Sequence, residues 1–164
     1  DKLSLFFKEN NSNYSHIFID CPPSLSLLTV MALVASSSLI VPLQTEFFAL
    51  EGLTQLVKTI DRVKESLNSN LSIRGIILTM YDKRNKLSSQ VEKEARDYFK
   101  DKVYNTVIPR NVRLSEAPSH GIPVLIYDKT CPGSKSYSNL TEEFLNQEKI
   151  MESAAWVFLN KKKV

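Results

Sequence analysis

Short apolar runs alternate with longer amphipathic segments along the 164-residue chain, and this alternation limits the folds open to it. The runs are rich in Ile, Val and Leu, as in strands that are buried on both faces. They span residues 16–20, 38–43, 73–80 and 103–108. Helical periodicity follows at 24–35, 50–67, 88–99 and 134–146. Strands that alternate with crossover helices predict an α/β fold, a doubly wound and mainly parallel sheet with helices on both faces.

Shorter segments complete the expected order of elements. An amphipathic helix is expected around Leu3–Phe7, and Ser88 or Ser89 is expected to cap the helix at 88–99. After Pro109 the sequence predicts at most a short helix at 112–117 and an extended piece at 123–127. Residues 1–150 are expected to belong to a single domain. Residues 151–164 form an apolar and basic tail, which either contacts a membrane surface or DNA or is a non-native extension.

Polar residues follow three of the apolar runs. In an open parallel sheet, ligands bind beyond the carboxyl ends of the strands, so these places are candidates for one site. They are Asp20-Cys-Pro-Pro, Met80-Tyr-Asp-Lys-Arg and Pro109-Arg-Asn-Val-Arg.

Asp20 is the first of these candidates. A carboxylate at a strand tip can hold Mg²⁺ through water while the ion bridges two phosphates. Pro22 and Pro23 remove two backbone donors, so the strand must end there and a separate loop begins. The same pattern also fits an aspartate that merely ends a strand and caps the next turn.

Glycine and cysteine usage excludes several kinds of site. The four glycines are more than ten residues apart, so the 164 residues contain neither a G-x-x-x-x-G-K-[ST] loop nor a G-x-G-x-x-G fingerprint. Two distant cysteines and two histidines fit no zinc spacing. Cys21 reads as a packed thiol in a reducing cytosol rather than a nucleophile.

Basic residues are concentrated in one part of the chain. The segment 82–113 holds nine Lys and Arg against five Asp and Glu, an excess larger than the +3 net charge of the whole chain. This segment is a candidate surface for nucleic acid. Lys93, Arg96 and Lys100 alternate with acids, and a solvated helix face is the favoured interpretation for them.

Four ordered motifs then point to a family. "FIDCPPSLSLLT", "VPLQTEFFALEGLTQL", "ILTMYDKRNKLSSQV" and "VIPRNVRLSEAPSHGIPV" resemble the ParA/Soj family of chromosome and plasmid partitioning ATPases, which are deviant Walker P-loop ATPases related to MinD. The resemblance runs from about Tyr14 to Phe144 and matches the C-terminal part of such a protein. The Walker A loop and switch I are expected upstream of Asp1.

The resemblance implies a role for individual residues. Asp20 corresponds to the Walker B aspartate on the Mg²⁺ side of ATP, and Cys21, Pro22, Pro23 and Ser24 correspond to switch II. Pro109 and Asn111 match the adenine-pocket loop, and Met80 flanks the same base. Arg84 and Arg113 match positions that contact DNA without sequence preference. Thr45–Leu53 either covers the sheet or lies near the family's dimer interface.

The resemblance also implies a function. We expect a bacterial, cytoplasmic and nucleoid-associated protein that forms an ATP-dependent homodimer on nonspecific DNA, with hydrolysis stimulated by a ParB-like partner. Whether these 164 residues alone hydrolyse ATP is left open, because the Walker A lysine is absent from them. The alternative is an inactive remnant that keeps a DNA- or protein-binding surface. Positioning at a membrane, as in MinD, is disfavoured by "IPRNVRLSEAPS".

Overall fold

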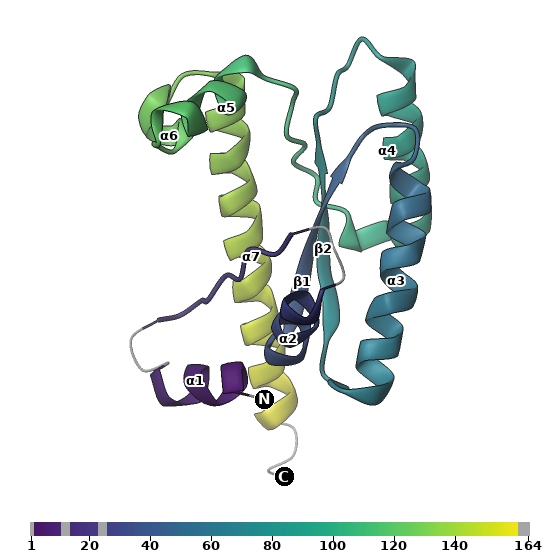
Figure 1. Ribbon diagram of the computed structural model, residues 1–164, viewed down its shortest axis with the longest axis vertical. Coiled ribbons are helices and arrows are strands. Elements are labelled where there is room, and N and C mark those ends of the chain that lie inside the picture. The colour runs from purple at the N-terminus through teal and green to yellow at the C-terminus, as the bar shows by residue number, and fades with distance from the viewer. Residues whose placement is uncertain (1, 11–13, 23–25, 161–164) are drawn as a thin grey trace. The chain divides into compact units, whose positions relative to one another are not determined.

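Two paired strands form the sheet, and a short stretch of chain lies beside the end of one of them. The computed structural model describes residues 2–10, 14–22 and 26–160 (Figure 1). Strands β1 (Ser38–Gln44) and β2 (Ser72–Thr79) are neighbours, joined by the crossover helix α3 (Ala49–Ser66). Beyond β2, Tyr81 and Pro109 form a parallel bridge, and the Ile108 amide donates to the Leu78 carbonyl at 2.8 Å. The parallel α/β class expected from the sequence is confirmed.

The contacts divide the chain into two compact units, each with its own core. The first comprises residues 1–41 and 48–76, and the second comprises 42–47 and 77–164.

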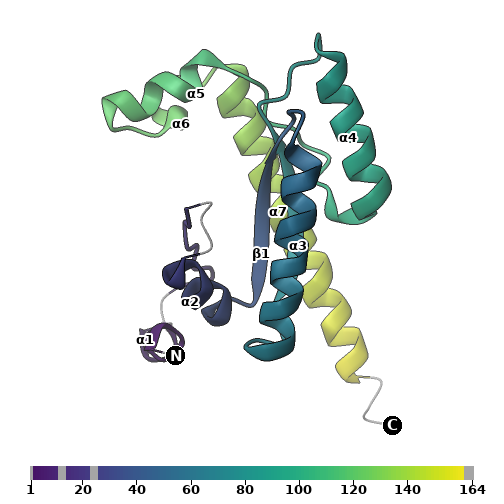
Figure 2. The ribbon, with the colours of Figure 1, turned by 45° about the vertical axis from the view of Figure 1, so that its right-hand side comes forward.

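The first unit packs helices against the paired strands. It contains α1 (Lys2–Asn10), α2 (Leu27–Ala35) and α3. Helix α3 runs along the strands, and α1 lies against α2 (Figures 1 and 2). The buried core consists of Leu33, Ile60, Val63 and Leu71. The side-chain amide of Asn68 donates to the carbonyls of Leu33, Val34 and Ser36 at the end of α2, at 2.8–3.2 Å.

The second unit is mainly helical. Its elements are α4 (Lys86–Phe99), the 3-10 turns η2 (Lys100–Lys102) and η3 (Ala117–His120), α5 (Val112–Glu116), α6 (Val124–Tyr127) and α7 (Pro132–Asn160). Tyr104, Ile108 and Leu140 form its buried core, with Leu114 and Phe144 packed against them. The helices expected at the start of the chain, at 50–67, at 88–99 and at 134–146 are present. The helix expected at 24–35 is present over Leu27–Ala35, and residues 24 and 25 lie outside the described residues.

Two expected strands are wrong. Residues 16–20 form no strand, and the side chains of Ile17 and Phe18 are 44% and 72% exposed. A strand needs a hydrogen-bonded neighbour, and the two-stranded sheet consists of β1 and β2. In the run at 103–108, the amides of Asn105 and Thr106 donate to the Glu143 carboxylate of α7, at 2.7 and 2.9 Å, rather than to a strand.

Glu143 therefore replaces a strand neighbour for this run. Burial opposes ionisation of Glu143, but the hydrogen bonds from the Asn105 and Thr106 amides outweigh it and lower the pKa of the carboxyl. The segment from Ile108 to Arg110 runs beside the end of β2.

Two local details also differ from expectation. Helix α4 is capped by Asn85, whose side-chain oxygen accepts from the Leu87 amide at 3.0 Å, instead of by Ser88 or Ser89. The piece at 123–127 is a helical turn, α6, because the Pro123 and Val124 carbonyls accept from the amides of Tyr127 and Asp128. Among the described residues, no helix is both long enough and apolar enough to cross a membrane.

Candidate functional site

A buried hydroxyl group forms hydrogen bonds that link the carboxyl end of β1 to the end of β2 and the segment after it. Thr45 follows β1 directly and is 1% exposed. Its Oγ1 lies 3.3 Å from the Thr79 carbonyl, 3.4 Å from the Met80 carbonyl and 3.2 Å from Ser88 Oγ. These contacts fix the backbone at the strand ends in the second unit. The sequence placed Thr45 in a segment that covers the sheet or lies near the family's dimer interface and did not predict these contacts, although a polar residue directly after an apolar strand is a signal of this kind.

Met80 and Pro109 lie in the same short ladder. The Tyr81 amide donates to the Ile108 carbonyl at 3.1 Å, and the Arg110 amide donates to the Tyr81 carbonyl at 3.0 Å. Met80 has a φ of 54°, a left-handed conformation that is uncommon for a residue with a side chain. The structure thus brings these two residues, predicted to flank one ligand, to neighbouring positions.

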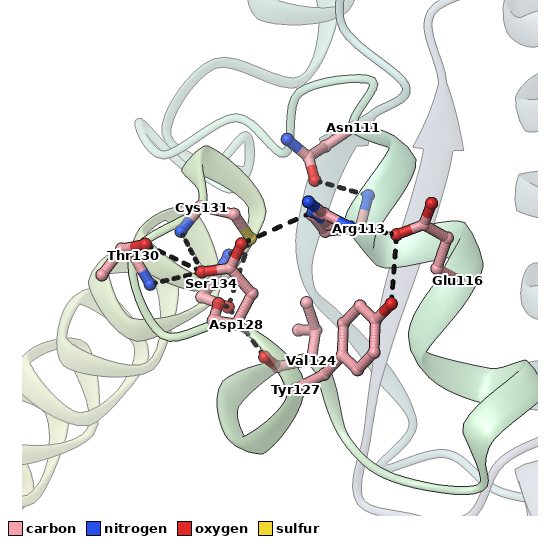
Figure 3. A network of polar contacts seen from close by, with 9 residues as sticks. All are labelled: Asn111, Arg113, Glu116, Val124, Tyr127, Asp128, Thr130, Cys131 and Ser134. Atoms are coloured by element: carbon pink, nitrogen blue, oxygen red, sulfur yellow. Dashed lines mark hydrogen bonds and ion pairs between the residues drawn. The ribbon is translucent and has the colours of Figure 1, made fainter.

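Asn111 follows this ladder and caps α5. Its side-chain oxygen accepts from the Arg113 amide at 3.0 Å. The amide nitrogen points away from this contact (Figure 3). The cap therefore uses the oxygen of the side chain and leaves the nitrogen side available for other contacts.

Arg113 lies at the centre of a polar network that joins α5 to the turn before α7 (Figure 3). Its Nη1 donates to Glu116 Oε2 at 2.8 Å, and its Nε lies 3.6 Å from Asp128 Oδ2. The Tyr127 hydroxyl donates to Glu116 Oε2 at 3.3 Å. The hydrogen bond from Arg113 lowers the pKa of Glu116, so this carboxylate is ionised at neutral pH.

Asp128 and Ser134 complete the network on the α7 side. Asp128 Oδ1 accepts from the hydroxyl and amide of Thr130 and from the Cys131 amide, and the Thr130 contacts are the main reason why the pKa of Asp128 is lowered. Ser134 is buried, and its Oγ lies 2.5 Å from the Asp128 carbonyl. The network fixes the backbone around Arg113.

Two other arginines at the strand ends have carboxylate partners. Arg84 makes two contacts of 3.2 Å with Asp82, through Nε and Nη2. Arg110 Nη2 lies 3.1 Å from Glu46 Oε1. On α4, Arg96 pairs with Glu92 one turn away at 3.0 Å, which agrees with a charged helix face at this position.

Asp20 lies in the first unit, as do Cys21 and Pro22 of the predicted switch II. Asp20, Cys21 and Pro22 are exposed, and Pro23 and Ser24 lie outside the described residues. No group of three or more His, Cys, Asp or Glu that could hold a metal ion occurs in the part of the chain that the structure describes. A single exposed carboxylate fits Mg²⁺ only as one ligand among waters and phosphates. The roles of Asp20 and switch II stay predictions.

A hollow of about 570 Å³ in the second unit has both charges in its lining. Its lining includes none of the individual residues to which the sequence assigned a site. Its lining consists of Arg96, Asp97, Lys100, Asp101, Val103, Asn105 and Gln147.

Comparison with known proteins decides the family. Residues 2–73 match the family model described as "AAA domain". The chain is 57% identical over 145 residues to the chromosome partitioning protein ParA of Caulobacter vibrioides, which covers 88% of this chain and 54% of that protein. It is also 56% identical over 131 residues to the sporulation initiation inhibitor protein Soj of Bacillus subtilis, covering 80% of this chain and 52% of that protein.

The chain belongs to the ParA/Soj family. It spans about half the length of the curated relatives that it matches.

Solved structures agree with this ParA-like fold. Cobyrinic acid a,c-diamide synthase from Mycobacterium smegmatis, with bound ADP and magnesium, matches with a TM-score of 0.70 and 28% identity, over 90% of this chain and 53% of that chain. The cell division ATPase MinD of Pyrococcus furiosus matches with a TM-score of 0.70 over 89% of this chain and 58% of that chain. At 22% identity the MinD match supports the fold alone.

Proposed function

We propose that the chain provides the C-terminal half of a ParA-type partitioning ATPase, which acts in chromosome or plasmid segregation. The complete protein binds ATP and Mg²⁺, forms a nucleotide-dependent homodimer on nucleoid DNA, and is released when a ParB-like partner stimulates hydrolysis. The 57% identity to the Caulobacter protein over 145 residues is the observation that carries this proposal.

Nonspecific DNA binding is assigned to Arg84 and Arg113. Both side chains are exposed, at 90% and 51%; Arg84 follows β2, and Arg113 follows the bridge at Pro109. Nonspecific affinity comes mainly from cationic side chains that replace counterions on phosphates, and exposed arginines suit this role. The Asn111 cap and the network around Asp128 give Arg113 a fixed backbone position.

ATP and Mg²⁺ binding is assigned to four residues. Met80, Pro109 and Asn111 flank the base, and Asp20 supports Mg²⁺ beside the phosphates through water. When bound, the ion neutralises charge that develops on the phosphates. The neighbouring positions of Met80 and Pro109 support the base side of this proposal. We propose that residues outside these 164 supply the phosphate-binding loop.

A second candidate is a catalytically inactive remnant with a DNA-binding surface. Arg84, Arg113 and their carboxylate partners all lie in the second unit, whereas Asp20 lies in the first. ATP hydrolysis separates the candidates, because the remnant binds DNA equally with and without Mg-ATP and hydrolyses none.

Alanine substitution of both arginines tests the DNA assignment. Binding of random-sequence duplexes is measured by fluorescence anisotropy over a series of KCl concentrations. Each of Arg84→Ala and Arg113→Ala is expected to weaken binding to all sequences alike and to flatten the salt slope by about one. Lys93→Ala, on the exposed face of α4, is the matched control and should change the slope less. Unchanged binding, or a loss confined to one sequence, contradicts the assignment.

A further inference from the structure

The arginine assigned to DNA after β2 already holds an anion. Asp82 and Arg84 are joined by two contacts of 3.2 Å, in which Nε and Nη2 meet the two carboxylate oxygens. The Arg84 amide also donates to Asp82 Oδ1 at 3.0 Å, so the backbone turn brings the two side chains together. The side chain of Arg84 is nevertheless 90% exposed.

Arg113 has the same kind of partner in a different local structure. Glu116 lies one helical turn along α5 and accepts from Nη1 at 2.8 Å. Its carboxylate is oriented from a second side by the Tyr127 hydroxyl. Two independent pieces of backbone, a turn and a helix, therefore place a carboxylate against an arginine that is assigned to phosphate.

A carboxylate and a phosphate use the same donors of a guanidinium. Arginine binds either anion through parallel N–H groups, and the two oxygens of Asp82 occupy the Nε and Nη2 edge of Arg84. A DNA phosphate can reach that edge only when the carboxylate has left it.

From this geometry we propose that Asp82 and Glu116 compete with DNA phosphate for Arg84 and Arg113, and so limit the affinity of the protein for DNA. The proposal rests on the DNA assignment of these two arginines. Binding is then an exchange of an internal ion pair for an ion pair with DNA.

The charge state of the carboxylates agrees with competition. Hydrogen bonds from Arg84 lower the pKa of Asp82, and the hydrogen bond from Arg113 lowers that of Glu116. Both groups are thus ionised at neutral pH. Because exposed ion pairs are weak, removing one competitor should tighten DNA binding by about two- to five-fold.

The test uses Asp82→Asn and Glu116→Gln in the full chain, with random-sequence duplex DNA as the probe. Both substitutions keep the shape of the side chain and remove its charge. Each is expected to tighten binding two- to five-fold, with the salt slope kept, because the same arginines still meet phosphate. Glu94→Gln is the control, since Glu94 accepts from Gln90 and pairs with no arginine among the described residues.

A second background separates competition from a general change of net charge. When Asp82→Asn is added to the Arg84→Ala variant, it should tighten DNA binding no more than Glu94→Gln does. The reason is that the Arg84 N–H groups, for which carboxylate and phosphate compete, are absent from that variant. Urea unfolding checks the fold of each variant. Asp82 lies in a turn outside any helix or strand, so its variant remains informative if Glu116→Gln unfolds.

The outcomes distinguish this proposal from the one it rests on. If Arg84→Ala and Arg113→Ala weaken binding but the carboxylate variants match Glu94→Gln, competition is wrong and the DNA assignment stands. An equal gain from Asp82→Asn in the Arg84→Ala background also overturns competition. If the arginine variants leave binding unchanged, both proposals fail.

Discussion

At the scale of single residues, the side chain of Asn111 can serve as a helix cap and also contact a ligand. Its oxygen caps α5, while the resemblance assigns the residue to a base-binding loop. The two roles use different atoms, because an N-cap needs only an acceptor.

Substitution of Asn111 separates these atoms. Asn111→Ala is expected to lower the free energy of unfolding by about 1 kcal/mol, the usual value of an N-cap. Asn111→Asp keeps the acceptor oxygen and should retain most of the stability while it removes the amide nitrogen. Urea unfolding of the three proteins measures this difference. Equal destabilisation by both substitutions would show that the cap does not contribute.

Individual site residues could be predicted from the sequence only in part. The exposure of Arg84 and Arg113, at 90% and 51%, agrees with their expected role, because a side chain that contacts DNA must reach solvent. Their partners were missed for two physical reasons. The pairing with Asp82 depends on the turn geometry, and Asp128 reaches Arg113 only through the fold of α5, α6 and α7.

At the scale of elements, α5 and α7 lie in close contact where Leu114 meets Gly133. A Cβ atom on Gly133 would lie 2.6 Å from Leu114 Cγ, well inside van der Waals contact. Leu114 packs against the buried core of the second unit, so its side chain has little room to move.

Gly133→Ala therefore tests this contact. We expect a loss of about 1–3 kcal/mol in the free energy of unfolding, as for an overpacked core. Gly52→Ala in α3 is the matched control, since its Cβ meets nothing within 4 Å. That substitution should stabilise the protein by about 0.5–1 kcal/mol through helix propensity. Urea unfolding measures both, and an equal gain from the two substitutions would contradict the packing argument.

The long helices were predictable, whereas two of the four short apolar runs were assigned wrongly. Helix α3 was expected at 50–67 and spans Ala49–Ser66, because an amphipathic period over five turns is a strong local signal. The runs at 16–20 and 103–108 carry the same apolar composition as β1 and β2. Whether such a run becomes a strand depends on a neighbour far away in the sequence, or on a competing acceptor such as Glu143.

At the scale of the whole molecule, exposed apolar residues are concentrated near the start of the first unit. Ile17, Phe18, Leu27 and Leu28 are 44–76% exposed. Chains of the curated relatives are about twice as long as the part matched here. We propose that residues 16–20 become a paired strand, as their composition predicts, when the remaining half of such a protein is present.

Amide hydrogen exchange followed by mass spectrometry tests this proposal directly. In the 164-residue chain, amides at 16–20 should exchange rapidly, whereas those of β1 and β2 should be protected by their pairing. Addition of a polypeptide that corresponds to the unmatched half of the Caulobacter relative should slow exchange at 16–20 and leave the protection of β1 and β2 unchanged. Protection of 16–20 in the chain alone would show that the segment already has a partner, and unchanged rapid exchange after addition would show that pairing does not occur.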